Sequence, residues 1–228
     1  MLQNLIDLLF TNTCPACSRV LLNNEGFLCT GCMYRLPRTR YRDMRNNPVA
    51  RLFWGRVNLQ YATAIYHYSN GGMLQEIIHK LKYRGNKHAG TELGKLVGME
   101  LKGTCYSNVD IVIPVPLHNV KLRQRGYNQS ELIAEGLCRE LEKPLNRTSC
   151  KRLKQTGTQT HKSRYERWEN VQGGFNIMER YAFTGKHILL VDDVVTTGAT
   201  LEALALELLS IGHVQVSVAA VAVADLLA

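Results

Sequence analysis

This 228-residue chain lacks any run of roughly 18–20 apolar residues, the length that a transmembrane helix needs. Its first ten residues include Asp7 but no basic residue, so they do not resemble a secretory signal, and their apolar positions favour a docking helix. No internal repeat, low-complexity segment or metal-ligand spacing among the seven histidines is evident. These absences argue against a membrane, exported or repeat protein, and we expect a cytoplasmic protein with reduced cysteines.

Acidic residues are scarce relative to basic ones: 19 Asp and Glu oppose 28 Lys and Arg, and the formal net charge is +9. This balance favours an anionic partner, although solvated basic surfaces are common. Helical stretches, among them 73–82 and 201–209, alternate with four apolar segments typical of buried strands, which span residues 61–68, 109–115, 186–191 and 214–223. The alternation predicts an α/β fold with a doubly wound parallel sheet.

The most informative segment follows the third of these strands. Asp192 and Asp193 stand at its carboxyl end, where open α/β sheets bind ligands. A loop of small and hydroxyl-bearing residues then leads into a helix, and it consists of Thr196, Thr197, Gly198, Ala199 and Thr200. Because a helix N-terminus presents free N–H groups, the loop suits a phosphate, and the pair of acids suits hydroxyls. The segment predicts a sugar phosphate site; the alternative is a turn whose acids merely cap the helix.

A second loop is expected at the same sheet edge, because strand 109–115 runs into Pro116 and Leu117 and then into a basic stretch with Arg123 and Arg125. Cations and free backbone donors suit a pyrophosphate, although a basic helix cap near solvent would look similar. The long polar stretch 152–171 is a candidate lid over such a ligand. Its candidate residues are Thr156, Gln159, Arg164 and Arg167.

Cysteines are paired near the N-terminus, as Cys14 with Cys17 and Cys29 with Cys32. Two CxxC pairs fit a structural zinc site with four thiolate ligands and no open coordination position, and buried or redox-active thiols are the alternative. Pro37 and Pro48 place a domain boundary near residues 45–58. We therefore predict two parts, an N-terminal helix with a zinc-ribbon-like module over 1–50 and an α/β domain over 51–228.

An arginine-rich stretch, 35–45, follows the second cysteine pair and carries five arginines against one acid. Arginines interleaved with tyrosines suit phosphate contact and base stacking, and a solvated linker explains them equally well. The residues expected to contact nucleic acid, from this stretch and from the basic turn after the first helix of the α/β domain, are Arg38, Arg40, Arg42, Arg84 and Lys87.

The run 191–200 resembles the phosphoribosyl pyrophosphate (PRPP) motif of type I phosphoribosyltransferases. That resemblance implies that Asp192 and Asp193 bind the ribose hydroxyls, that residues 196–200 wrap the 5′-phosphate, and that the loop after 109–115 binds pyrophosphate with Mg²⁺. The whole pattern is similar to the ComF competence-protein family, including its GntX-type members. The likeness comprises the cysteine module and the segments 81–85, 114–117, 123–129, 156–175 and 192–200. Two departures are His161-Lys162, where relatives carry Gly-Leu, and Ala199 in place of a second glycine.

The family resemblance implies a type I phosphoribosyltransferase-like domain behind a zinc module, with a role in the uptake of single-stranded DNA during natural transformation. Three functions stay open at this point. The protein is a DNA-uptake factor with a PRPP pocket, an active phosphoribosyltransferase on an unidentified acceptor, or a PRPP or nucleotide sensor that binds protein partners of an uptake machine.

Overall fold

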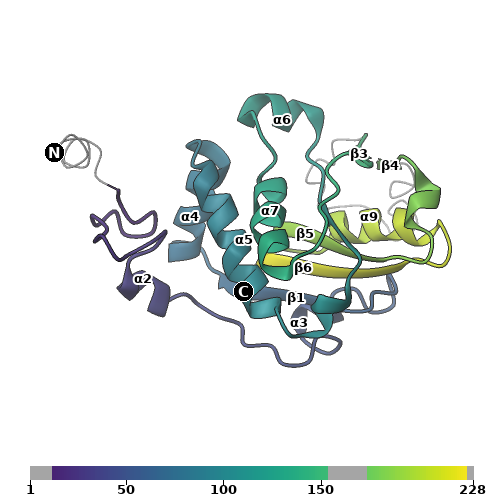
Figure 1. The fold of residues 1–228 in the computed structure, drawn as a ribbon, viewed down its shortest axis with the longest axis horizontal. Coiled ribbons are helices and arrows are strands. Elements are labelled where there is room, and N and C mark those ends of the chain that lie inside the picture. The colour runs from purple at the N-terminus through teal and green to yellow at the C-terminus, as the bar shows by residue number, and fades with distance from the viewer. Residues whose placement is uncertain (1–11, 154–173, 225–228) are drawn as a thin grey trace.

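The computed structural model describes residues 12–153 and 174–224. Its centre is a parallel sheet in the order β1-β6-β5-β2 (Figure 1). The strands span Ala62–Tyr68 (β1), Ile111–Pro114 (β2), His187–Val195 (β5) and Gln215–Ala224 (β6). The four predicted strands are thus confirmed. β5 continues past the predicted end at residue 191, because Asp192 and Val194 still pair with Ala220 and Ala222 of the central strand β6.

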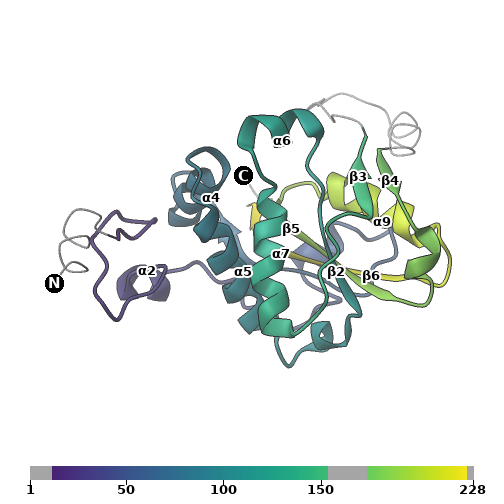
Figure 2. The ribbon, with the colours of Figure 1, turned by 45° about the horizontal axis from the view of Figure 1, so that its top comes forward.

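Helices cover both faces of the sheet, which confirms the doubly wound arrangement. One face packs against α4 (Met73–Tyr83), α5 (Lys87–Leu101) and α7 (Gln129–Leu141), which lie side by side in Figures 1 and 2. The other face packs against α3 (Pro48–Arg51), α9 (Ala199–Leu209) and the antiparallel pair β3 (Cys150–Arg152) and β4 (Phe175–Ile177). The remaining short elements are α2 (Thr30–Tyr34), α6 (Asn119–Arg125), η1 (Cys105–Asn108) and η2 (Arg180–Phe183).

Helices α5 and α7 approach at backbone distance because glycines face one another across their interface. A Cβ built on Gly94 would lie 1.9 Å from the carbonyl oxygen of Ile133, and one on Gly136 would lie 2.0 Å from that of Thr91. Any side chain at either position would therefore push the helices apart. This contact matters for the site, because α7 begins directly beside the carboxyl end of β5.

The cysteine segment joins the same core as α4 and α5, since Cys14, Phe27 and Leu36 are buried together with residues of both helices. The chain then runs along β1, where Arg38 forms an antiparallel bridge with Tyr66 and covers the outer edge of the sheet. The predicted division of the chain at residue 50 stays a prediction. Among the described residues, no helix is long and apolar enough to cross a membrane.

Candidate functional site

Asp192 and Asp193 lie near the carboxyl end of β5, where α4 and α7 meet the sheet. Asp192 is half-buried and accepts a hydrogen bond of 2.9 Å from the hydroxyl of Ser130, in the first turn of α7. Asp193 is 5% exposed, and its Oδ2 lies 2.8 Å from the ammonium group of Lys82, near the end of α4. The two acids are thus held by different helices, one through a hydroxyl and the other through a cation.

These surroundings shift the pKa values of Asp192 and Lys82. Burial and the adjacent charge of Asp193 raise the pKa of Asp192 to about 7. Burial alone would lower the pKa of Lys82, but its carboxylate neighbours outweigh that effect and the pKa of Lys82 is raised. Asp192 therefore gains and loses its proton near neutral pH, while Lys82 stays charged beside Asp193.

The two carboxylate oxygens of Asp193 have different partners. Its Oδ1 accepts a 2.6 Å hydrogen bond from the backbone N–H of Val194, whereas the buried Oδ2 faces the ammonium group of Lys82 at 2.8 Å. The ammonium group therefore compensates the buried carboxylate, which little water can reach.

The loop that follows β5 has the form expected for a phosphate cradle at the N-terminus of α9. Thr196 and Thr197 are exposed, and Gly198 adopts φ +74°, a conformation that favours glycine. A Cβ on Gly198 would lie 2.8 Å from the ring of Phe53. Arg56 donates a 3.0 Å hydrogen bond to the carbonyl of Thr197. The sequence analysis did not single out Phe53 or Arg56, because nothing local links them to a loop about 140 positions later.

The predicted pyrophosphate residues lie in the loop before α6 and in the last turn of α6, a helix that stands away from the body in Figures 1 and 2 and has no buried residue. Pro116 and Leu117 are half-buried in the loop after β2, and Arg123 is exposed. Arg125 donates a 2.8 Å hydrogen bond to Gln129 and its guanidinium lies 5.2 Å from the ring centre of Tyr83.

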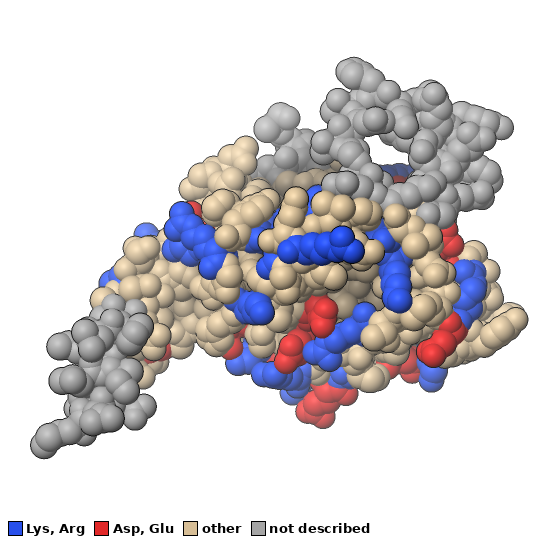
Figure 3. Space-filling view, turned by 90° about the horizontal axis from the view of Figure 1, so that it is seen from above, with Lys and Arg blue, Asp and Glu red and all other residues tan. Residues whose placement is uncertain are grey.

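A cavity of about 290 Å³ opens between α6 and the end of α4, and it is lined by Lys82, Tyr83, Gly85, Lys121, Gln124, Arg125 and Tyr127. None of these lining residues, taken from the described part of the chain, is acidic, and Lys82 connects the cavity to Asp193 through their ion pair. Lys and Arg side chains are spread over this face of the molecule in Figure 3, which views it from the side of α6. The cavity therefore suits a polyanion in contact with the acid pair.

The five residues predicted to bind nucleic acid do not form one surface. Arg84 and Lys87 are exposed at the turn beside the cavity, and Lys87 lies 5.2 Å from the ring centre of Tyr127. Arg38 pairs with Glu100 of α5 at 3.1 Å, and Arg40 is exposed next to it in the chain. Arg42 lines a separate cavity. The predicted lid residues Thr156, Gln159, Arg164 and Arg167 lie outside the described residues, as does the expected helix over 1–10.

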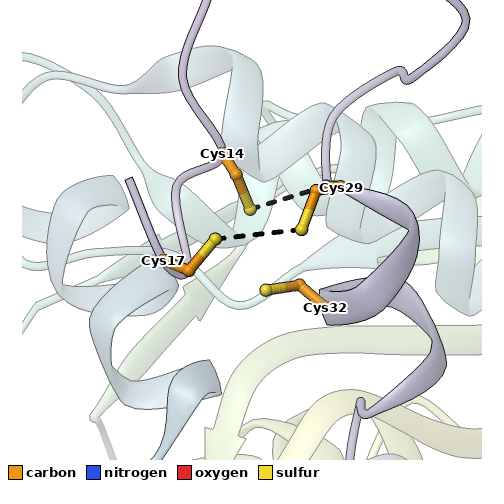
Figure 4. A group of neighbouring side chains, drawn as sticks. All are labelled: Cys14, Cys17, Cys29 and Cys32. Carbon is orange, nitrogen blue, oxygen red and sulfur yellow. Dashed lines mark hydrogen bonds between the residues drawn. The ribbon is translucent and has the colours of Figure 1, made fainter. Parts of the chain in front are cut away.

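The four cysteines converge, as Figure 4 shows, with their sulfur atoms directed at one another. All four Sγ atoms lie within 4.8 Å of one another, and Cys17 and Cys29 are 3.8 Å apart. Sulfur atoms about 2.3 Å from a tetrahedral zinc are separated by about 3.8 Å, so the spacing fits that metal.

The ionisation of these thiols also favours a cation. Burial opposes ionisation of Cys14, but backbone N–H groups of Cys29, Cys17 and Ala16 outweigh it and lower its pKa to about 7. Burial and the neighbouring thiols raise the pKa of Cys32 to about 12. One thiolate forms readily, whereas the full set of four needs a bound cation.

Comparison with known proteins identifies the fold and its relatives. A family model described as the phosphoribosyl transferase domain matches residues 128–226. The chain is 30% identical over 209 residues to the DNA utilization protein YhgH of Shigella flexneri, a match that covers 90% of this chain and 87% of that protein. It is 36% identical over 110 residues to competence protein F of Haemophilus influenzae, a match that spans 48% of each chain. Over 188 residues it is 28% identical to competence protein ComFC of Bacillus subtilis, covering 82% of this chain and 68% of that protein.

Solved structures align with this chain at lower similarity. Glutamine phosphoribosylpyrophosphate amidotransferase from B. subtilis aligns with a TM-score of 0.44 and 20% identity, over 63% of this chain and 30% of that one.

Proposed function

Since this chain belongs to the ComF family, we propose that it is a DNA-uptake factor that binds PRPP and single-stranded DNA. The proposal rests above all on the acid pair. Asp192 and Asp193, held by Ser130 and Lys82, place two adjacent carboxyl groups at the carboxyl edge of the sheet. Relatives named for competence and DNA utilization support the cellular role.

The three parts of PRPP correspond to three parts of the site. The ribose hydroxyls would donate to Asp192 and Asp193, and the 5′-phosphate would accept from the loop at residues 196–200. The pyrophosphate would lie toward Arg125 and the cationic cavity. Oxygen ligands suit Mg²⁺, which would supply positive charge that neutralises the pyrophosphate. Lys82 would hold the carboxylate of Asp193 in place through their ion pair, so that this residue can accept a hydrogen bond from a ribose hydroxyl.

Single-stranded DNA would bind at the same basic face. Arg84 and Lys87 offer exposed cations, and the ring of Tyr83, which is 65% exposed, offers a stacking surface for a base. Binding through phosphates releases counterions and therefore weakens as the salt concentration rises.

The cysteine cluster would hold a structural zinc ion through Cys14, Cys17, Cys29 and Cys32. Four thiolates complete a tetrahedral shell, so the ion would take no substrate. The ion would hold the turns at 14–17 and 29–32 together, and so stabilise the cysteine segment where it packs against α4 and α5.

An active transferase is a second candidate, favoured by the position of two carboxylates beside the expected ribose. The bond from C1′ to the pyrophosphate oxygen would break with its electron pair leaving on pyrophosphate, while an acceptor lone pair forms the new bond to C1′. The acids would orient the ribose and stabilise positive charge at C1′. Pyrophosphate release that depends on an acceptor, and that disappears in Asp192→Ala, Asp193→Ala, would support it. Equal release from the double variant would exclude it.

Calorimetry with PRPP and Mg²⁺ on the zinc-loaded full chain tests ligand binding. We expect saturable binding that Asp193→Asn weakens at least tenfold, whereas Glu142→Gln, a substitution of an exposed acid far from the site, leaves it unchanged. Absence of binding by the unaltered chain would refute the proposal.

Fluorescence polarisation with a labelled oligonucleotide over a salt series tests DNA binding. The variant Arg84→Gln, Lys87→Gln should bind more weakly and lower the slope of log K against log salt by about 1.4, from about 0.7 per phosphate contact. The matched control is Lys102→Gln, Arg139→Gln, which removes the same charge from two other exposed positions. Equal losses in both variants would exclude the proposed location.

A further inference from the structure

The last turn of α4 contacts four parts of the molecule through four consecutive residues. Lys80 donates a 2.8 Å hydrogen bond to the carbonyl of Pro15 in the first cysteine turn, and Lys82 forms the ion pair with Asp193. Between them, the carbonyl of Leu81 accepts a hydrogen bond from the hydroxyl of Tyr127, after α6. Tyr83 then packs beneath the guanidinium of Arg125. We call residues 80–83 the linking turn.

The cysteine segment holds this turn from one side. Pro15 lies between Cys14 and Cys17, so the position of its carbonyl depends on how the two thiols are held. Cys14 and Cys29 are buried in the same core as Leu81. The ring of Phe27 also packs edge-on against His88 at 6.1 Å, just beyond the linking turn. The cysteine segment therefore supports the linking turn through one hydrogen bond and a shared apolar core.

The acid pair holds the turn from the other side. Lys82 reaches a carboxylate that is 5% exposed, and the side chain of Lys82 is itself 22% exposed. A buried carboxylate loses a large part of its stabilisation when its cation moves away, because little water can replace the cation. A small displacement of the linking turn would therefore remove the ion pair that orients Asp193, the residue expected to accept a hydrogen bond from a ribose hydroxyl.

We propose that the linking turn couples the four-cysteine cluster to the ribose phosphate site, with Lys82 as a positioning residue for Asp193. The inference rests on the proposed function and extends it. Metal bound by the four thiols holds the carbonyl of Pro15, which anchors Lys80 and so keeps Lys82 beside Asp193. Loss of the metal frees the first cysteine turn and lowers the affinity for PRPP, although no thiol would touch the ligand.

Such coupling is reciprocal. If zinc raises the affinity for PRPP by a given factor, PRPP with Mg²⁺ raises the affinity for zinc by the same factor. We expect a factor of about ten, within the usual range for coupled sites. Two independent measurements must therefore give the same factor, one of the affinity for PRPP and one of the affinity for zinc.

The experiment compares the full-length chain with Lys80→Met and with the control Lys95→Met. Lys80→Met removes the hydrogen bond to Pro15 and the local ion pair with Glu76, but it keeps roughly the same side-chain volume, the cysteines and the ligand residues. Lys95→Met removes the same charge and one local ion pair from neighbouring α5. Calorimetry measures PRPP binding with zinc-loaded protein and after removal of zinc by a chelator, and competition with a chromophoric chelator measures zinc affinity with and without PRPP.

In the unaltered chain and in Lys95→Met, removal of zinc should weaken PRPP binding about tenfold, and PRPP should raise zinc affinity about tenfold. Lys80→Met should retain one zinc per chain, but its PRPP binding should be weakened even with zinc present. The effect of zinc on PRPP affinity and the effect of PRPP on zinc affinity should both fall toward a factor of one. If the zinc-free chain loses its far-ultraviolet circular dichroism, it has unfolded and its PRPP binding says nothing about coupling. The PRPP affinities of the two zinc-loaded variants then decide whether the two sites are coupled.

Equal PRPP affinities of zinc-loaded Lys80→Met and Lys95→Met would overturn the coupling and leave the proposed function intact. Failure of the unaltered zinc-loaded chain to bind PRPP would refute the proposed function itself. The two failures are therefore distinguishable in one set of titrations.

Discussion

The adjacent acids of the site should have opposite effects on stability. In the folded chain the pKa of Asp192 is raised from 3.8 to about 7, so between roughly pH 4 and pH 7 the folded state holds a proton that the unfolded state has released. Stability then falls as the pH rises through this window, and the full penalty applies above pH 7. Asp192→Asn removes the penalty, so the variant should be more stable than the parent at pH 8 and equal to it at pH 4.

The magnitude follows from the size of the shift. About three pKa units at about 1.36 kcal/mol each set an upper limit of about 4 kcal/mol. We expect about 2 kcal/mol, because Ser130 and the backbone N–H of Asp193 donate to the carboxylate and would bind a neutral amide less strongly. Asp193→Asn should instead destabilise the chain by about 2 kcal/mol, since it leaves the ammonium of Lys82 without its nearest partner.

Urea unfolding of zinc-loaded protein without ligand, followed by tryptophan fluorescence at pH 5 and pH 8, measures both effects. Subtracting the free energy of unfolding of the parent from that of each variant at the same pH removes the contribution of other titrating groups. Glu142→Gln is the control for the removal of one exposed acid. The reasoning fails if Asp192→Asn is no more stable than the parent at pH 8, or if the difference between them is the same at both pH values.

Three further outcomes are expected. Tyr66→Phe should not lower the melting temperature, because the buried Tyr66 hydroxyl has no hydrogen-bond partner among the described residues. Tyr106→Phe should lower the melting temperature, because it loses a 2.9 Å hydrogen bond and about 1 kcal/mol of stability. Equal losses of stability in the two variants would contradict this reasoning. Gly136→Ala should cost about 1–3 kcal/mol or more in urea unfolding, while Gly26→Ala, with nothing within 4 Å, should be nearly neutral. Metal analysis should find one zinc per chain and a large loss in Cys17→Ser; a stoichiometry far below one in the parent would exclude the four-cysteine site.

Part of the site could be predicted from the sequence because the residues that form it are neighbours in the chain. Apolar segments that are buried on both faces of a parallel sheet are continuous in the sequence, so the strands were found from their composition. Asp192, Asp193 and the loop to Thr200 form one uninterrupted segment, and the two cysteine pairs show their spacing directly. In each case the residues that act together are neighbours in the chain, or pair by a repeated short spacing.

The contacts that complete the site join residues far apart in the sequence, and only the tertiary structure decided them. Lys82 reaches Asp193 because α4 ends at the carboxyl edge of the sheet, and Phe53 meets Gly198 because α3 and α9 cover the same face. The arginines that looked alike in the sequence were separated, with Arg38 paired to an acid and Arg84 exposed beside the cavity. The sequence alone determined the strands, the acid pair and the cysteine spacing, since local periodicity encodes them. Tertiary packing decided which cation forms an ion pair with which acid, because these side chains come into contact only after the helices have packed on the sheet.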